Sequence, residues 1–228
     1  MTATRVAVGF LVVLPIAFNV LFGVLGRRFG YPAILRMSTD HVLREFDAGG
    51  ASLRLTWSAF ALTALAFAPL SVLVGATLGA RSTTVMSVAS ACGVLAGLVQ
   101  ALGLARWPFV VPHLARTYLD PSSSEPARAA SVVVFEALHR YLGVGVGEHL
   151  GYLLTGTWTV LVGVAALDSS VPGWLGPIGI VVGSALVVGS AEFLGRFEER
   201  GWKAAGAIVP VAYVAWSTWL VALGLAIL

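Results

Sequence analysis

Five polar side chains stand out in a chain that is otherwise strongly apolar: Asn19, Gln100, Glu148, His149 and Glu192. Each of them interrupts or borders a run of apolar residues. A carboxyl next to an imidazole can donate and accept protons, and all five side chains can hydrogen-bond a polar ligand. Because polar groups inside apolar spans are costly, these residues are candidates for a functional site.

The neighbours of Glu148 favour a site around this carboxyl. On an α-helix, Tyr141, Tyr152 and Thr155 share its face, so Glu148 would lie among hydrogen-bonding groups and could carry a proton. The hypothetical catalytic pair is Glu148 and His149, and the predicted ligand-binding residues are Asn19, Gln100, Trp107, Tyr152 and Glu192. Two structural alternatives stay open: Glu148 is a hydrogen-bonded structural acid, or Glu192 reaches the membrane interface or pairs with Arg196.

The composition indicates the environment in which these residues act. The chain is 58% hydrophobic and 11% charged, with a mean hydropathy of +0.90. Soluble domains carry about 25% charged residues, so this chain lacks the polar groups to cover a globular surface, and a bilayer is the solvent that tolerates it. The net charge of +3 is too small to indicate nucleic-acid binding.

Six apolar stretches are long enough to cross roughly 30 Å of hydrocarbon as helices. They cover about residues 6–26, 55–80, 82–105, 144–167, 174–194 and 204–228. No small-residue cleavage site follows the first stretch, which we therefore expect to be a retained span. The sequence predicts an all-α, polytopic membrane protein with one six-span domain over residues 1–228.

The distribution of basic residues predicts the orientation. Most of the 14 Lys and Arg residues fall in the segments 27–54, 106–128 and 196–203. Basic loops stay in the cytoplasm, so we expect both termini outside the cytoplasm, in a bacterial inner membrane. Asn19 and Gln100 then lie roughly 10 Å from the cytoplasmic ends of their spans, and the other polar candidates lie at a similar depth. We infer a polar pocket that faces the cytoplasm.

The segment between the first two spans is expected to contain a short amphipathic helix. Ser38 or Thr39 is the N-cap candidate, and the Gly-Gly pair at 49–50 ends the helix. Asp40 and Arg44 form an i,i+4 pair on its polar face. The apolar face consists of Val42, Leu43 and Phe46. This pattern predicts an interfacial helix that lies on the lipid headgroups.

The segment after the third span contains Pro108 and Pro112, which we expect to end that span. A helix is predicted to start near Ser124 and to continue into the fourth span. On this helix, Glu136 and Arg140 are i,i+4 partners, so a structural salt bridge explains both residues.

Small residues recur at intervals of four in two spans. Ala89, Gly93, Gly97, Ala101 and Ala105 form the series in the third span, and Gly143, Gly147, Gly151, Thr155, Thr159 and Gly163 form the series in the fourth. Close helix packing in lipid needs small residues at the contact. We therefore predict that these two spans are central and tightly packed.

Metal and haem sites find little support in the sequence. Glu136-x-x-His139 matches one half of a di-iron carboxylate pattern, which needs a second half and two further Glu residues. The single Cys92 lies in an apolar run, where a buried and inert thiol is expected. We expect no metal and no cofactor.

Several stretches resemble an actinobacterial family of integral membrane proteins. They are FGYPAILR with HVLREFDAGG, LVQALGLARWPFVVPHLARTY, FEALHRYLGVGVGEHLGYLLTGTWT, GSAEFLG and VPVAYVAWSTWLVALG. The family is domain of unknown function 4386. The resemblance covers nearly the whole chain and implies a multi-span architecture, but it implies no activity and no catalytic residue.

Three functions follow from these patterns. The first is binding of a small molecule or lipid in the polar pocket, in a transporter or a sensor. The second is a membrane-embedded enzyme that acts on a lipid or isoprenoid, with Glu148 as the acid or base and His149 and Tyr152 in support. The third is a structural protein in which the glycine series, Gly147 included, mediates assembly, for example of a homo-oligomer.

Overall fold

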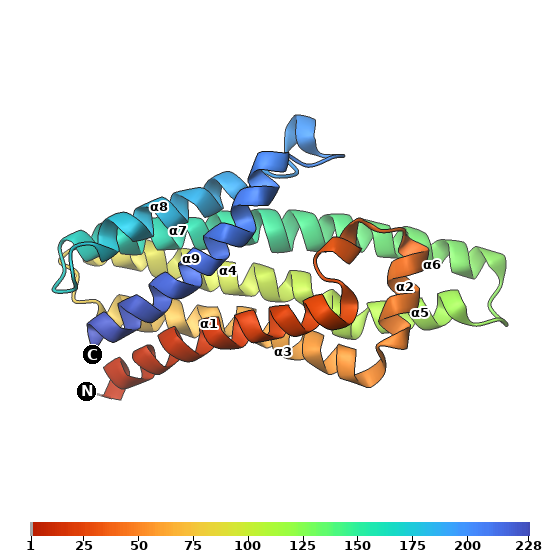
Figure 1. Ribbon diagram of the computed structural model, residues 1–228, viewed down its shortest axis with the longest axis horizontal. Helices are drawn as coiled ribbons and strands as arrows, with labels where there is room; N and C mark the ends of the chain where they lie inside the picture. The colour runs from red at the N-terminus through yellow and green to blue at the C-terminus, as the bar shows by residue number, and fades with distance from the viewer. Residues whose placement is uncertain (1) are drawn as a thin grey trace.

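The computed structural model describes residues 2–228, and every regular element in this range is a helix (Figure 1). The long helices are α1 (Thr2–Phe29), α3 (Gly50–Thr77), α4 (Thr83–Phe109), α7 (Gly151–Leu167), α8 (Leu175–Gly189) and α9 (Lys203–Ile227). The shorter ones are α2 (Thr39–Ala48), α5 (Val111–Leu119) and α6 (Glu125–Leu138), with 3₁₀ turns at Ala33–Arg36 and Gly195–Phe197. A π-helix, His139–Leu150, joins α6 to α7 without a break.

Five continuous helical segments are long and apolar enough to cross a membrane. They are Ala3–Phe29, Gly50–Thr77, Thr83–Leu119, Glu125–Leu167 and Lys203–Ile227. The remaining apolar helix, α8, has 15 residues and extends over roughly 22 Å, less than the hydrocarbon thickness of about 30 Å. The fifth span was predicted over residues 174–194, but its helix ends at Gly189, because residues 190–194 form turns.

Figure 1 shows both chain termini at one end of the bundle, which we call the terminal end. The opposite end carries α2, α5 and α6, and we call it the basic end because most of the Lys and Arg residues lie toward it, whereas the loop 190–202 projects from the side of the bundle. The helices α1 and α9 run side by side at the terminal end, and α9 leans away from α1 toward the basic end (Figure 1).

Two apolar cores fill the two halves of the bundle. In the terminal half, Phe67, Trp158, Trp216 and Trp219 pack together with the surrounding Leu and Val side chains. In the basic half, the core is centred on aromatic rings, and those of Trp57 and Trp107 stack with centroids 4.7 Å apart. The candidate site lies between these two cores.

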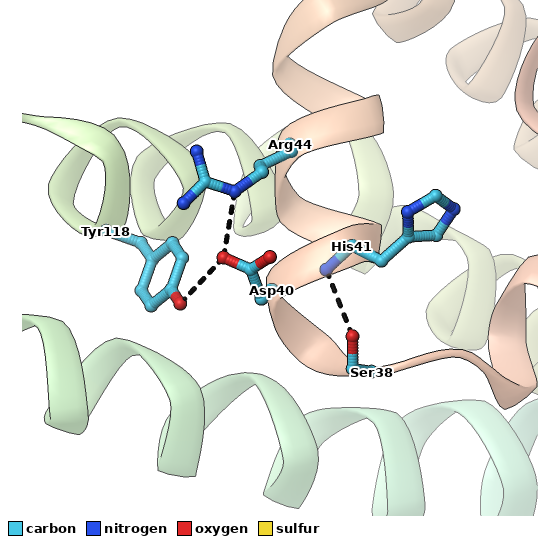
Figure 2. Close-up of polar contacts among 5 residues, drawn as sticks. All are labelled: Ser38, Asp40, His41, Arg44 and Tyr118. Atoms are coloured by element: carbon cyan, nitrogen blue, oxygen red, sulfur yellow. Dashed lines mark hydrogen bonds and ion pairs between the residues drawn. The ribbon is translucent and has the colours of Figure 1, made fainter.

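The short helix α2 has the capping that the sequence predicts. The Ser38 side chain accepts a hydrogen bond from the His41 amide, and Gly49 follows the last residue of the helix. Figure 2 shows the predicted pair of Asp40 and Arg44, whose Nε lies 2.9 Å from Oδ1. The same carboxylate oxygen accepts a hydrogen bond of 2.9 Å from the Tyr118 hydroxyl.

The apolar face of α2 is turned into the protein. Val42, Leu43 and Phe46 are all buried in the basic-half core. The reason for predicting an interfacial helix is therefore wrong, because the apolar face that was expected to enter the headgroup layer packs against other helices. The Asp40–Tyr118 hydrogen bond fixes α2 to α5 in this position.

The third predicted span does not end at its prolines. The helix α4 continues through Pro108 to Phe109, and α5 follows after Val110, whose backbone is itself in the α-helical region. Pro108 lies in the last turn of α4, and Pro112 lies in the first turn of α5, where the missing N–H removes no hydrogen bond. The helix predicted to start near Ser124 and to continue into the fourth span is confirmed, because Ser124 caps α6 and the helix runs on to Leu167.

The small residues of α4 and of the fourth span are used in contacts within the chain. A Cβ at Gly97 would lie 2.9 Å from backbone atoms of α3, and one at Gly103 would lie 2.7 Å from the Gly147 Cα. On α7, a Cβ at Gly156 would lie 2.6 Å from the Gly183 carbonyl oxygen of α8. These three contacts place α4 and the fourth span at the centre of the bundle, packed against each other through Gly103 and Gly147.

Candidate functional site

A cavity of about 610 Å³ lies in the basic half of the bundle. Its wall is formed by α1, α3, α4, the π-helix, α7, α9 and the loops that follow α1 and α8. We call it the basic-end cavity. The cavity does not extend into the terminal half, because the Trp158, Trp216 and Trp219 side chains fill the space between the helices there.

Most of the site residues predicted from the sequence line this cavity. The wall includes Asn19, Gln100, Trp107, Glu148, Tyr152 and Glu192. His149 is the exception: its Nδ1 lies 2.7 Å from the Ser190 carbonyl oxygen, at the end of α8. The structure thus separates the side chains of the hypothetical catalytic pair, and the roles of all seven residues stay a prediction.

The π-helix explains how Glu148 reaches the cavity. It contains Gly143, Gly145 and Gly147, and π-helical turns inserted into α-helices occur frequently at functional sites. Glu148 follows the point where Gly147 touches Gly103 of α4. Glu148, the residue after this contact, lines the cavity.

The contact of α4 with the π-helix and the start of α7 is made of successive antiparallel pairs. A Cβ at Gly143 would lie 2.6 Å from a terminal guanidinium nitrogen of Arg106, and a Cβ at Gly151 would lie 2.6 Å from Gln100 Cγ. The pairs are Arg106 with Gly143, Gly103 with Gly147, and Gln100 with Gly151. Each long polar side chain of α4 therefore passes over a glycine of the opposite helix.

The two amides of the site are hydrogen-bonded inside the protein. Gln100 Nε2 donates to the Thr155 hydroxyl at 3.0 Å. Asn19 Nδ2 donates to the Ser217 hydroxyl at 2.9 Å and to the Pro15 carbonyl at 2.7 Å. Their carbonyl oxygens stay available as acceptors on the cavity wall.

Arg106 is a member of the site that sequence analysis missed, because the third span was predicted to end at Ala105. The residue is 6% exposed and lines the cavity. One terminal nitrogen donates to the Gly103 carbonyl oxygen, and the other lies 3.5 Å from His139 Nδ1. Its Nε has no hydrogen-bond partner within residues 2–228.

Neither Arg106 nor Glu148 belongs to an ion pair within the described part of the chain. An arginine keeps its charge in proteins, and a buried charge without a counter-ion is unfavourable. Arg106 has the Gly103 carbonyl oxygen and the Trp107 ring, whose centroid lies 5.2 Å from its Cζ, as neighbours, but no carboxylate within ion-pair distance. The arginine and the carboxyl face the same cavity within about one helical turn of the Gly103–Gly147 contact. The sequence signal that could have found Arg106 is its position directly after the predicted third span, one residue beyond Ala105.

The other half of the cavity wall is aromatic. Phe18, Phe22 and Phe60 line it together with Tyr31 and Tyr213, and the Phe18 and Tyr213 rings lie 5.7 Å apart. Burial raises the pKa of the Tyr31 phenol, and the Glu148 charge acts in the same direction, so this group keeps its proton as a donor. The cavity thus combines an apolar wall with a polar one.

Glu192 pairs across the mouth of the cavity. Its carboxylate lies 2.8 Å from a terminal nitrogen of Arg36, in the loop after α1. The alternative pairing with Arg196 is therefore wrong, because the turns that follow α8 aim Glu192 at a different loop. The Arg36 guanidinium also lies over the Phe193 ring, 5.2 Å from its centroid.

The predicted salt bridge of Glu136 with Arg140 is also replaced by other contacts. Glu136 accepts a hydrogen bond of 2.9 Å from the Thr39 hydroxyl, and Arg140 pairs with Glu198 at 3.4 Å. Arg140 lies in the π-helix, where the spacing of side chains around the axis differs from that of an α-helix. Within residues 2–228, no three His, Cys, Asp or Glu side chains gather in a way that could hold a metal ion.

The composition, the long apolar helices and the helical architecture define a multi-pass membrane protein. The chain matches the family model "Domain of unknown function (DUF4386)" over residues 7–224, and it belongs to this family. The match confirms the family resemblance seen in the sequence, whereas the actinobacterial origin stays a prediction. Neither a curated protein nor a solved structure matches the chain.

Proposed function

We propose that this protein binds an amphiphilic small molecule or a lipid in the basic-end cavity, from the cytoplasmic side of the membrane. One observation carries the proposal: the unpaired Arg106 and Glu148 share a cavity whose remaining wall is aromatic. Its volume of about 610 Å³ lies in the usual range for ligand pockets. A ligand with a polar and an apolar end would match both walls.

The orientation is part of this proposal. Both termini lie at one end of the bundle (Figure 1), and a chain whose ends share a side crosses the membrane an even number of times. Six crossings, with α8 as a short fifth span, agree with this condition, whereas five do not. The positive-inside rule places the basic end in the cytoplasm of a bacterial cell.

The cavity is closed toward the terminal end, which favours binding or sensing over an open transport path. Trp158 and Trp216 are 0% and 5% exposed in the terminal-half core. Transport would need a second conformation in which these rings separate. Assembly through the glycine series finds less support, because Gly147 faces Gly103 of its own chain.

A matched pair of variants in the π-helix tests the proposal. Val144 lines the cavity, and Val146, two positions further on, does not. Val144→Trp is expected to fill the cavity, while Val146→Trp adds the same ring elsewhere. Native mass spectrometry of the protein, purified in mild detergent, measures the small molecules that stay bound.

We expect a bound mass on the wild type and on Val146→Trp, and little or none on Val144→Trp. Equal occupancy of both variants would place the ligand outside the cavity. A wild-type protein without any bound mass, after extraction of membranes under conditions that keep lipids attached, would also contradict the proposal.

A second candidate function is an enzyme that acts on a lipid or an isoprenoid, with Glu148 as the acid or base. The observation that favours it is the aromatic cavity that surrounds this carboxyl and is closed toward the terminal end. Tyr152 and Tyr31 line the same cavity and would support Glu148, whereas His149 bonds to the end of α8. Extracted membrane lipids incubated with wild type and with Glu148→Gln distinguish the two functions. A product that only the wild type forms indicates catalysis, and unchanged lipids with both proteins indicate binding alone.

A further inference from the structure

The helices α1 and α9 touch in the terminal half of the bundle and separate in the basic half. A Cβ at Gly224 of α9 would lie 2.9 Å from the Leu11 Cβ of α1. Further along, Asn19 of α1 donates to Ser217 of α9 at 2.9 Å. Beyond this hydrogen bond, toward the basic end, residues of both helices line the cavity, and α9 leans away from α1 (Figure 1).

The gap between the two helices is bounded at the basic end as well. The Arg36–Glu192 ion pair, at 2.8 Å, joins the loop that follows α1 to the loop that precedes α9. The Arg36 guanidinium also covers the Phe193 ring. Four elements thus border this side of the cavity, namely the Asn19–Ser217 bond, the ion pair, α1 and α9, and the Phe18 and Tyr213 ring centroids lie 5.7 Å apart between the two helices. We call this side of the cavity the α1–α9 window.

The window faces the side of the bundle, where the surface is apolar. Val211 and Val214 of α9 are 70% and 60% exposed, and Val20 of α1 is 58% exposed. Val214 also lines the cavity. Exposed apolar side chains on membrane-spanning helices face lipid, so the cavity wall reaches the hydrocarbon region at Val214.

The polar wall of the cavity presents two opposite charges to a ligand. Arg106 offers a fixed positive charge that suits a phosphate. Glu148 offers an acceptor that suits a positively charged donor. Both belong to helices locked together at Gly103 and Gly147, within about one turn of each other. A ligand that carries a phosphate and an ammonium group close together would neutralise both charges at once.

We infer, on the basis of the proposed function, that the cavity takes a phospholipid with a phosphate–ammonium headgroup, which enters sideways from the cytoplasmic leaflet. The headgroup lies between Arg106 and Glu148, and the acyl chains leave through the α1–α9 window. The aromatic rings of Phe18, Phe22 and Tyr213 contact the first part of the chains. The ion pair of Arg36 with Glu192 keeps the headgroup from the aqueous side.

The test measures which lipids the full-length protein retains. The protein is reconstituted in vesicles of equal parts phosphatidylethanolamine and phosphatidylglycerol, extracted in mild detergent, and analysed for both lipids. We expect the wild type to retain phosphatidylethanolamine preferentially. Glu148→Gln keeps the shape of the side chain and removes its charge, and it should lower this preference roughly tenfold, the value of one charge-assisted hydrogen bond.

Two variants on α9 test the route. Val214→Phe narrows the window, and Val211→Phe adds the same ring at an exposed position that does not line the cavity. We expect Val214→Phe to slow the exchange of labelled phosphatidylethanolamine into the protein at least several-fold, and Val211→Phe to leave it unchanged. Equal exchange rates for the two variants would contradict the lateral route.

Free O-phosphoethanolamine distinguishes a lipid from a soluble headgroup compound. It should fail to displace the retained lipid at millimolar concentration, and efficient displacement would overturn the assignment to a lipid. Equal retention of both lipids, still lost in Val144→Trp, would overturn the headgroup assignment and leave the proposed function intact. If the protein retains neither lipid but carries a different bound mass, the headgroup assignment is wrong and the proposed function stands. If it carries no bound mass at all, both the headgroup assignment and the proposed function are contradicted.

Discussion

The contact between Gly103 of α4 and Gly147 of the π-helix predicts the clearest mutational effect in the protein. A Cβ at Gly103 would lie 2.7 Å from the Gly147 Cα and 2.7 Å from the Leu142 carbonyl oxygen. Both partners are backbone atoms, so no side chain can move aside. Ordinary carbon contacts are about 3.5–4.0 Å, and Gly103→Ala must therefore push the two helices apart.

The expected cost follows from known effects of overpacking. Extra methyl groups in well-packed interiors cost about 1–3 kcal/mol, and the better helix propensity of Ala returns up to about 1 kcal/mol. We expect a net loss of about 0–2 kcal/mol for Gly103→Ala, and a difference of about 1–3 kcal/mol from a matched Gly→Ala control that gains the same helix propensity without the clash. Gly145→Ala is the control, because a Cβ there would lie 3.7 Å from the Arg140 carbonyl oxygen, an ordinary contact, and its stability should stay equal or rise.

The assay is reversible unfolding of the purified protein in mixed micelles with increasing denaturing detergent. A second readout is the lipid retention described above, because Gly103 and Gly147 set the spacing between Arg106 and Glu148. Gly103→Ala should weaken retention as well as stability, and Gly145→Ala should lower neither. If Gly103→Ala proves as stable as Gly145→Ala, the close approach of α4 and the π-helix is wrong.

Three further predictions concern other parts of the molecule. The Asn19–Ser217 hydrogen bond should give a coupling free energy of about 0.6 kcal/mol in a double-mutant cycle with Ala at both positions, as is typical between membrane helices, and a coupling near zero would contradict the bond. The hydrogen bond from Tyr118 holds the pKa of the exposed Asp40 below its usual range. The wild type should therefore be more stable than Tyr118→Phe above about pH 4, and this difference in stability should shrink as the pH falls through the lowered pKa. A stability difference that stays constant with pH in unfolding experiments would refute this prediction. Alkaline phosphatase fused after Leu228 should be active in a bacterial host and a fluorescent protein fused there dark, and the reverse pattern would exclude the proposed orientation.

The short-range features of this protein were open to prediction from sequence. Ser38 as the cap of α2 and the Asp40–Arg44 pair depend on positions three and four residues apart, which helix geometry alone brings together. The apolar helices follow from composition, because a chain so poor in charge has to be solvated by lipid. The approximate depth of Asn19 and Gln100 follows from the constant rise of a helix.

The misplaced features depend on distant segments or on departures from α-helical geometry. Arg36 and Glu192 are 156 positions apart, and nothing near Glu192 indicates this partner. Arg106 was assigned to a loop because a proline usually ends a helix, but Pro108 lies in a last turn that α5 continues. His149 was paired with Glu148 because the two are adjacent, yet its side chain bonds to the end of α8.

The sequence by itself determined the solvent of this protein and the depth of each polar residue along its helix, because hydropathy and helical rise are local properties. Only the tertiary structure decided which residues face one another. Rotation of a helix about its axis depends on its neighbours, and here the contact of Gly103 with Gly147 decides it. Through that contact, Arg106 and Glu148 come to share one cavity, although each alone is an isolated charge in an apolar chain.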